Sequence, residues 1–229
     1  MKIDYTLVKF ENIFLKTRQA TKLRGYFANK FPDEKIISNH NGDKFVYNYP
    51  KVQYKIIDGQ PIICGINEGS LLISQIGFNT DEIDIDGERI NICQMSIIRK
   101  PLDFGVCENY VEYRFITPWM ALNQKNIGIY TKADDFEKED ILKRILIGNI
   151  LSMSKGLGYN VDSTLHTWLD VEECCVKFKN IDMKAFKGRF KVNFLIPEYL
   201  GLGKAVSRGL GTVVRAGKSD LYRGLAKSC

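Results

Sequence analysis

Apolar and polar positions follow two different periods along the first hundred residues. Most segments alternate with a period of two, which is typical of half-buried strands, whereas Leu23, Phe27 and their neighbours recur every three or four positions, as on one face of a helix. The predicted order, strand–helix–strand–strand–helix–strand, is that of a ferredoxin-like unit. The predicted segments are a strand at 2–10, a helix from Ala20 to near Pro32, strands at 51–57 and 62–66, a helix at 68–76 and a strand at 89–98.

The same pattern restarts after a boundary near residues 101–106. Asp134 followed by Glu137 has the spacing of a capping box, which predicts the start of a helix. The duplication rests on the order of elements, because the residues themselves show no repeat. We therefore predict an α+β protein of two tandem ferredoxin-like (RRM-like) domains with antiparallel sheets, at 1–103 and 104–229. The predicted segments are a strand at 110–117, a helix with Leu142, Leu146, Ile150 and Met153 on its apolar face, and strands at 173–178 and 189–196.

Composition is that of an ordinary globular protein. Of 229 residues, 45% are hydrophobic and 26% are charged. The first ten residues lack the apolar core of a signal peptide, and no run approaches the ~18 apolar residues of a membrane span. We expect a cytoplasmic protein without membrane contact. The six cysteines show no C-x-x-C spacing, which favours buried free thiols over metal ligands.

The net charge of +6 is unevenly distributed. Residues 176–229 hold twelve Lys and Arg against three Asp and Glu, a net of +9, which leaves −3 for the rest of the chain. A basic carboxyl-terminal quarter indicates a polyanionic partner, although a solvated basic face explains the charge alone equally well.

A glycine-rich segment, GLGKAVSRGLG at 201–211, follows the strand at 189–196. A dinucleotide fingerprint would need glycine where Val206 stands, and a P-loop would need serine or threonine where Ala205 stands. Glycine permits close backbone approach, and backbone N–H groups beside a lysine and an arginine suit phosphate. A tight loop without a ligand is the alternative. The candidate binding residues are Gly201, Gly203, Lys204, Arg208, Gly209 and Gly211.

The segment 193–214, NFLIPEYLGLGKAVSRGLGTVV, closely resembles the carboxyl-terminal signature of the CRISPR repeat-processing endoribonucleases. That signature is two glycine–hydrophobic–glycine units separated by five residues that include a basic one. KLRGYF at 22–27, YNYPKVQYK at 47–55 and PIICGINEG at 61–69 resemble one subgroup. The resemblance implies two ferredoxin-like domains and cleavage within the repeats of a CRISPR transcript. It also implies that the glycine-rich loop and nearby basic residues hold the RNA backbone.

RNA can be cut without metal or cofactor when its own 2′-hydroxyl attacks the adjacent phosphate, helped by a base, an acid and positive charge. Histidine suits the acid and base roles, and the chain has two. His40 lies in a polar turn after the first helix, where the resembling family carries its catalytic histidine. His166 matches no family motif and is interpreted as a structural or surface residue. Ser38 stands where some members have a second histidine, so Tyr47 and Lys30 are candidates to assist, unless the reaction does without that role.

Further binding residues are expected on the amino-terminal half. Candidate phosphate contacts are Arg24, Lys51 and Lys55, and candidate base-stacking residues are Tyr47, Tyr49 and Tyr54. Three functions stay open: the nuclease, a non-catalytic CRISPR RNA-binding subunit of an interference complex, and a ferredoxin-like regulator that binds a small molecule. The expected partner is CRISPR precursor RNA with its processed product. Other subunits of an interference complex and a second copy of the chain remain open.

Overall fold

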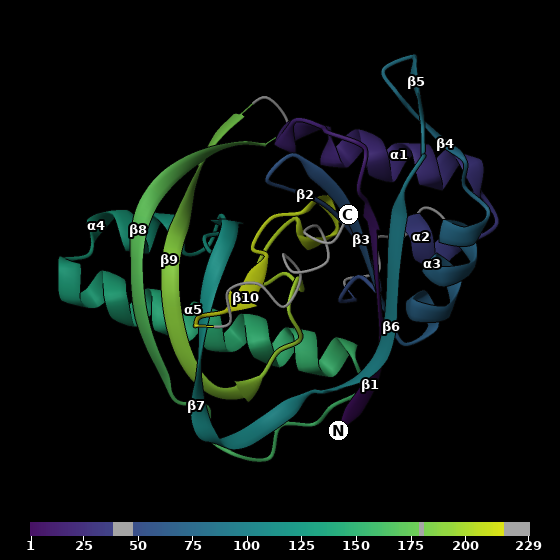
Figure 1. The fold of residues 1–229 in the computed structure, drawn as a ribbon. Coiled ribbons are helices and arrows are strands. Elements are labelled where there is room, and N and C mark those ends of the chain that lie inside the picture. The colour runs from purple at the N-terminus through teal and green to yellow at the C-terminus, as the bar shows by residue number, and fades with distance from the viewer. Residues whose placement is uncertain (39–47, 179–180, 218–229) are drawn as a thin grey trace.

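A computed structural model of the chain describes residues 1–38, 48–178 and 181–217. Two α+β units lie side by side, each built on a four-stranded antiparallel sheet (Figure 1). The prediction of two ferredoxin-like units is confirmed. The elements of the first unit are β1 (Lys2–Phe10), η1 (Thr17–Gln19), α1 (Ala20–Lys30), α2 (Lys35–Ser38), β2 (Val52–Ile57), β3 (Gln60–Ile66), α3 (Glu68–Phe78), β4 (Glu82–Ile85), β5 (Glu88–Asn91) and β6 (Met95–Asp103).

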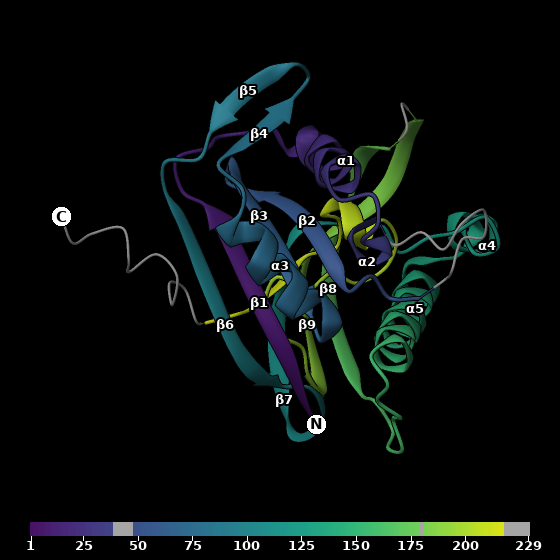
Figure 2. The same cartoon turned by 90° about the vertical axis from the view of Figure 1, so that its right-hand side faces the viewer.

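The first sheet has the order β2-β3-β1-β6, in which the two central strands are β3 and β1. Helices α1 and α3 lie on one face of this sheet (Figure 2). Leu23 and Phe27 of α1 are buried there because they share one side of the helix. They pack in one core cluster with Phe10 and Tyr54 of the strands. The helical periodicity therefore predicted this face correctly.

The predicted strand at 89–98 is wrong as a single element. The structure divides it between β5, which pairs with β4 in a hairpin, and β6, which begins at Met95. Asp86 and Gly87 join β4 to β5 with φ angles of 63° and 83°. Two successive positive φ angles suit a tight hairpin turn, and Asp-Gly is a favoured pair for it. This turn separates β4 from β5, whereas the predicted strand is interrupted between Asn91 and Met95.

The second sheet has the order β10-β7-β9-β8, which repeats the strand order of the first. One helix, α5, covers it, and the position of the second ferredoxin helix is taken by residues 196–212, where the only helical turn is η2. The glycine-rich segment thus replaces a helix. The elements are β7 (Gly105–Trp119), α4 (Ile127–Lys132), α5 (Asp135–Gly156), β8 (Thr167–Phe178), β9 (Ile181–Leu195), η2 (Val206–Arg208) and β10 (Val213–Arg215).

The predicted capping box at the start of α5 is confirmed. The Asp134 carboxylate accepts from the Glu137 amide at 2.9 Å, and the Glu137 carboxylate accepts from the Asp134 amide at 3.1 Å. These bonds satisfy two amides that a helix start leaves without intrahelical partners. The predicted apolar face of α5 is buried as expected, at Leu142, Leu146, Ile150 and Met153.

The second face of the first sheet is buried against the second unit. Tyr5, Leu7 and Ile62 belong to the same core cluster as Tyr113 and Phe190 of the second unit. Both faces of the sheet are therefore covered, although its strands alternate apolar and polar residues. Gln53 and Lys55 of β2 lie on this second face and are fully buried.

The cysteines differ in their exposure. Cys64 is buried, but Cys93 and Cys175 are exposed, so the expectation of buried thiols holds for only part of the set. Cys229 lies outside the described residues.

None of the helices in the described ranges combines the length and the apolar sequence that a membrane span requires.

Candidate functional site

The glycine-rich loop, residues 201–211, folds back on itself beside the end of β7. The Leu202 amide donates to the Gly211 carbonyl at 2.9 Å, and the Gly211 amide donates to the Pro118 carbonyl at 2.8 Å. The Lys204 amide donates to the Met120 carbonyl at 3.2 Å. These three amides are used within the protein and are not available to a ligand.

The glycines of the loop are required by its packing. Gly203, Gly209 and Gly211 have positive φ angles of 86°, 87° and 65°, a region that residues with a Cβ rarely adopt. A Cβ at Gly203 would lie 2.8 Å from the Met120 carbonyl oxygen, and one at Gly211 would collide with the carbonyl of Leu202. The positions where a Cβ would stand are therefore occupied by protein atoms.

Two residues of the first unit hold the loop at its start, Gln53 of β2 and Tyr49, which precedes β2. The Gly201 amide donates to Oε1 of Gln53 at 3.1 Å, and the Tyr49 hydroxyl donates to the Gly201 carbonyl at 2.7 Å. The Lys55 ammonium donates to the same Gln53 oxygen at 3.0 Å. Burial lowers the pKa of Lys55 to about 8. The candidate phosphate contact Lys55 thus lies between the two units, away from the surface.

The other candidate cations surround the loop. Lys204 is exposed on the loop itself. Arg208 is half-buried with its guanidinium 5.4 Å from the centre of the Phe178 ring, and Arg24 approaches from α1. Burial, followed by the charge of Arg208, lowers the pKa of the Arg24 guanidinium. Two arginines from different units therefore lie close enough to repel each other, an arrangement that an anion would stabilise.

Lys51 is also near the surface, at the start of β2. Its ammonium lies 2.5 Å from the Glu68 carboxylate, and this hydrogen bond lowers the pKa of that carboxyl group. Lys51 is thus paired, and a phosphate would have to compete with Glu68 for it.

The candidate catalytic residues fall partly outside the described chain. His40 and Tyr47 lie in the segment 39–47, and nothing is described of the Ser38 side chain. Lys30 is exposed in the last turn of α1, and its ammonium donates to the Tyr26 hydroxyl at 3.1 Å. His166 is exposed and directly precedes β8. Its backbone amide donates to the side-chain oxygen of Asn193 at 2.8 Å.

Two candidate stacking tyrosines have packing roles. Tyr54 is buried and its ring stacks on Phe27 at 5.8 Å between centroids. Tyr49 lies against Gly156, at the end of α5, and burial raises the pKa of its hydroxyl. The anchoring roles of Tyr49 and Gln53 were missed by the sequence analysis, because a polar residue on an alternating strand normally faces water.

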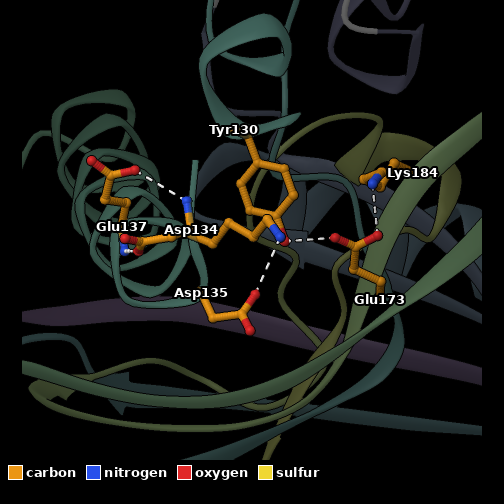
Figure 3. Close-up of polar contacts among 7 residues, drawn as sticks. Tyr130, Asp134, Asp135, Glu137, Glu173 and Lys184 are labelled. Carbon is orange, nitrogen blue, oxygen red and sulfur yellow. Dashed lines mark hydrogen bonds and ion pairs between the residues drawn. The ribbon is translucent and has the colours of Figure 1, made fainter. Parts of the chain in front are cut away.

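A second polar cluster joins α4, α5, β8 and β9 (Figure 3). The Tyr130 hydroxyl donates to the Glu173 carboxylate at 2.7 Å, and Lys184 pairs with the other oxygen of Glu173 at 2.7 Å. The bond from Lys184 is the main reason that the pKa of Glu173 is lowered, whereas burial raises the pKa of Tyr130. Each of these groups already has a partner, so the cluster fits a role in holding the helices on the sheet.

Comparisons with known proteins agree on one family. The family model described as the Cas6b N-terminal domain matches residues 1–102, and the one described as the Cas6b C-terminal domain matches residues 105–216. A crystal structure of Cas6b is 46% identical, with a TM-score of 0.90, and the match covers 94% of this chain and 100% of that one. A second crystal structure, described as the CRISPR RNA processing endoribonuclease Cas6b, is 41% identical with a TM-score of 0.77 and the same coverage.

A curated relative has a similar sequence identity, but its name describes no function. It is an uncharacterized protein of Methanocaldococcus jannaschii, 43% identical over 144 residues, which are 62% of this chain and 98% of the relative. The two family models together match nearly the whole chain, including the glycine-rich loop and the strand that holds it. The chain belongs to the Cas6b family.

Proposed function

We propose that this Cas6b-family endoribonuclease cuts within the repeats of a CRISPR precursor transcript, without metal, and releases individual guide RNAs. The observation that carries the proposal is the placement of the glycine-rich loop. It packs on β2 and on α1, and in the sequence the segment 39–47 with His40 lies between these two elements, directly after α2. The loop suited to an RNA backbone therefore rests on elements that stand on either side of the His40 segment in the sequence.

The proposed reaction is a transesterification. The 2′-oxygen of one nucleotide forms a bond to the adjacent phosphorus, and the bond from phosphorus to the 5′-oxygen of the next nucleotide breaks. A base takes the proton of the 2′-hydroxyl, and an acid gives a proton to the leaving 5′-oxygen. The products are a 2′,3′-cyclic phosphate, or the 3′-phosphate formed by its hydrolysis, and a 5′-hydroxyl. The attacking oxygen comes from the RNA, so no metal-bound water is needed.

His40 is proposed as the general acid or base. Ser38 stands where a second histidine would complete an acid–base pair, so a weaker group takes the other role or the role is unfilled. Tyr47 is proposed to orient or protonate an oxygen, and Lys30 to stabilise the charge that develops on the phosphate. Each proton-transfer role is typically worth ~10²–10⁴-fold, so an enzyme with one histidine remains active but slow.

The RNA backbone is proposed to lie along the basic side of the loop. Lys204, Arg208 and Arg24 supply the charge, and Lys51 adds to it when it leaves Glu68. The glycines contribute by letting the loop pack closely. The two halves, 1–103 and 104–229, then divide the work, because the first carries the histidine segment and the second carries the glycine-rich loop. The processed product is the proposed ligand after cleavage, and other interference subunits and a second copy of the chain stay open as further partners.

The test is cleavage of a labelled transcript with two repeats, in excess EDTA. Wild type is compared with His40→Ala and with the matched control His166→Ala, which removes the other histidine from an exposed position. We expect wild type and the control to cut once within each repeat, and His40→Ala to be slower by roughly 10²-fold or more.

Other outcomes select other functions. Tight binding of the repeat without cutting by wild type would favour the non-catalytic RNA-binding subunit. If wild type stops cutting in EDTA and cuts again when a divalent cation is added, the metal-independent mechanism is refuted. Equal cutting by all three proteins would remove His40 from the chemistry.

A further inference from the structure

We propose that Tyr49 and Gln53 are positioning residues, which hold the peptide groups of Gly201 and thereby fix where Lys204 and Arg208 meet the RNA. The inference rests on the proposed function, since it concerns how the same loop binds its RNA. The glycine-rich loop belongs to the second unit, whereas Tyr49 and Gln53 belong to the first.

The two side chains hold Gly201 from both sides. Gln53 accepts from its amide at 3.1 Å, and Tyr49 donates to its carbonyl at 2.7 Å. Both polar groups of Gly201 are thus bound by the other unit, one by Gln53 of β2 and one by Tyr49, which precedes β2. Because these bonds act on successive peptide units, they fix the position and the rotation of the chain where the loop begins.

The Gln53 amide has one orientation that fits its surroundings. The Gly201 amide and the Lys55 ammonium can only donate, so the atom that faces both must be the oxygen. The nitrogen of the same amide donates to the Pro50 carbonyl at 3.1 Å. The Gln53 side chain is fully buried and all three contacts are made inside the protein, so its position is well defined.

The loop also rests on β2 at its far end. A Cβ placed on Gly209 would lie 3.0 Å from the Tyr54 carbonyl oxygen and 3.2 Å from the Cα of Lys55. Lys204 and Arg208 lie between Gly201 and Gly209, so both ends of the basic part of the loop are placed by the same strand. Tyr49 in turn stands two residues after the segment 39–47. β2 and the residues just before it therefore position the loop at both ends of its basic part.

The experiment measures RNA affinity and its salt dependence for four variants. Tyr49→Phe removes one hydroxyl and leaves the ring, whereas Gln53→Leu removes the acceptor of the Gly201 amide. We expect the Kd for an uncleaved repeat, measured with His40→Ala as the common background, to rise roughly five-fold for Tyr49→Phe and ten-fold or more for Gln53→Leu. The slope of log Kd against log salt should become shallower by about one, because Lys204 and Arg208 no longer engage together.

Two variants separate positioning from general stability. Gln53→Glu keeps an acceptor for the Gly201 amide and for Lys55 and loses the bond to the Pro50 carbonyl, so we expect its Kd to rise less than that of Gln53→Leu. Tyr130→Phe is the matched control, because it also removes one hydroxyl bond from a buried tyrosine, but in the α4–β8 contact (Figure 3). Its Kd and salt slope should be unchanged.

The outcomes distinguish this inference from the function on which it rests. A wild-type protein that neither binds nor cuts repeat RNA would overturn the proposed function, and this inference with it. If wild type cuts, but Tyr49→Phe and Gln53→Leu bind with unchanged Kd and slope, the positioning role alone is refuted. The same conclusion follows if Tyr130→Phe weakens binding as much as Tyr49→Phe does.

Discussion

Lys55 offers a test of how tightly the two units close on each other. Its side chain is fully buried between them, and its ammonium has the Gln53 oxygen as an acceptor. Burial is the main reason that its pKa falls from 10.5 to about 8, and the neighbouring Cys64 acts weakly in the other direction. If the units separated in solution, Lys55 would be hydrated and its pKa would return towards 10.5.

The shift in pKa sets the sign and size of an effect on stability. Between about pH 8 and 10.5 the unfolded chain keeps the proton that the folded protein releases, so the free energy of unfolding rises with pH. The cost of burying the charge is therefore present below about pH 8 and is relieved above it. A gap of about 2.5 pKa units corresponds to roughly 3 kcal/mol, of which about 2 kcal/mol accrues between pH 7 and about pH 9.5.

The assay is urea unfolding of wild type and Lys55→Met at about pH 7 and about pH 9.5. Other titrating groups are common to both proteins, so the difference between the two isolates Lys55. We expect wild type to gain roughly 2 kcal/mol relative to the variant over this interval. A difference that stays constant within about 0.5 kcal/mol would refute the reasoning, because it would mean that Lys55 is hydrated and the contact between the units is open.

Three further predictions follow from the loop and from α5. Gly211→Ala should weaken repeat binding by ten-fold or more, because its φ of 65° and the Leu202 carbonyl both exclude a Cβ, and a filter-binding titration measures this. Lys204→Ala should weaken binding to all RNA sequences alike and reduce the slope of log Kd against log salt by about one; a sequence-selective loss would contradict a phosphate contact. Asp134→Ala should lower the free energy of unfolding by about 1 kcal/mol in thermal or urea melts, whereas the exposed Asp140→Ala nearby should stay within about 0.5 kcal/mol of wild type.

Short-range sequence patterns correctly predicted the elements that depend on residues close together in the chain. The stripe through Leu23 and Phe27 gave α1, and the spacing of Asp134 and Glu137 gave the first turn of α5, because both depend on residues three or four positions apart. The division of 89–98 was missed because the Asp86-Gly87 hairpin signal lies before this segment, and the residues between Asn91 and Met95 include no glycine or proline to mark a break.

Features that depend on contact between the units could not be predicted in this way. The alternation in β2 predicted a polar face in water, but Gln53 and Lys55 are buried because the glycine-rich loop, about 150 positions later in the chain, packs on them. For the same reason Lys55 was taken as a surface cation. Tyr54 was taken as a base-stacking ring, although it is buried within the first unit, where it packs against Phe27 of α1. The roles of His40 and Tyr47 stay predictions, since both lie outside the described residues.

The burial of the second face of the first sheet has a consequence for how the protein unfolds. Tyr5 and Leu7 of the first unit share a core cluster with Tyr113 and Phe190 of the second, so separating the units would expose large apolar surfaces on each. The duplicated fold should therefore behave as one cooperative body, with a single melting transition and coincident loss of secondary and tertiary signals. Either half expressed alone should aggregate, and RNA should meet a surface that is already assembled.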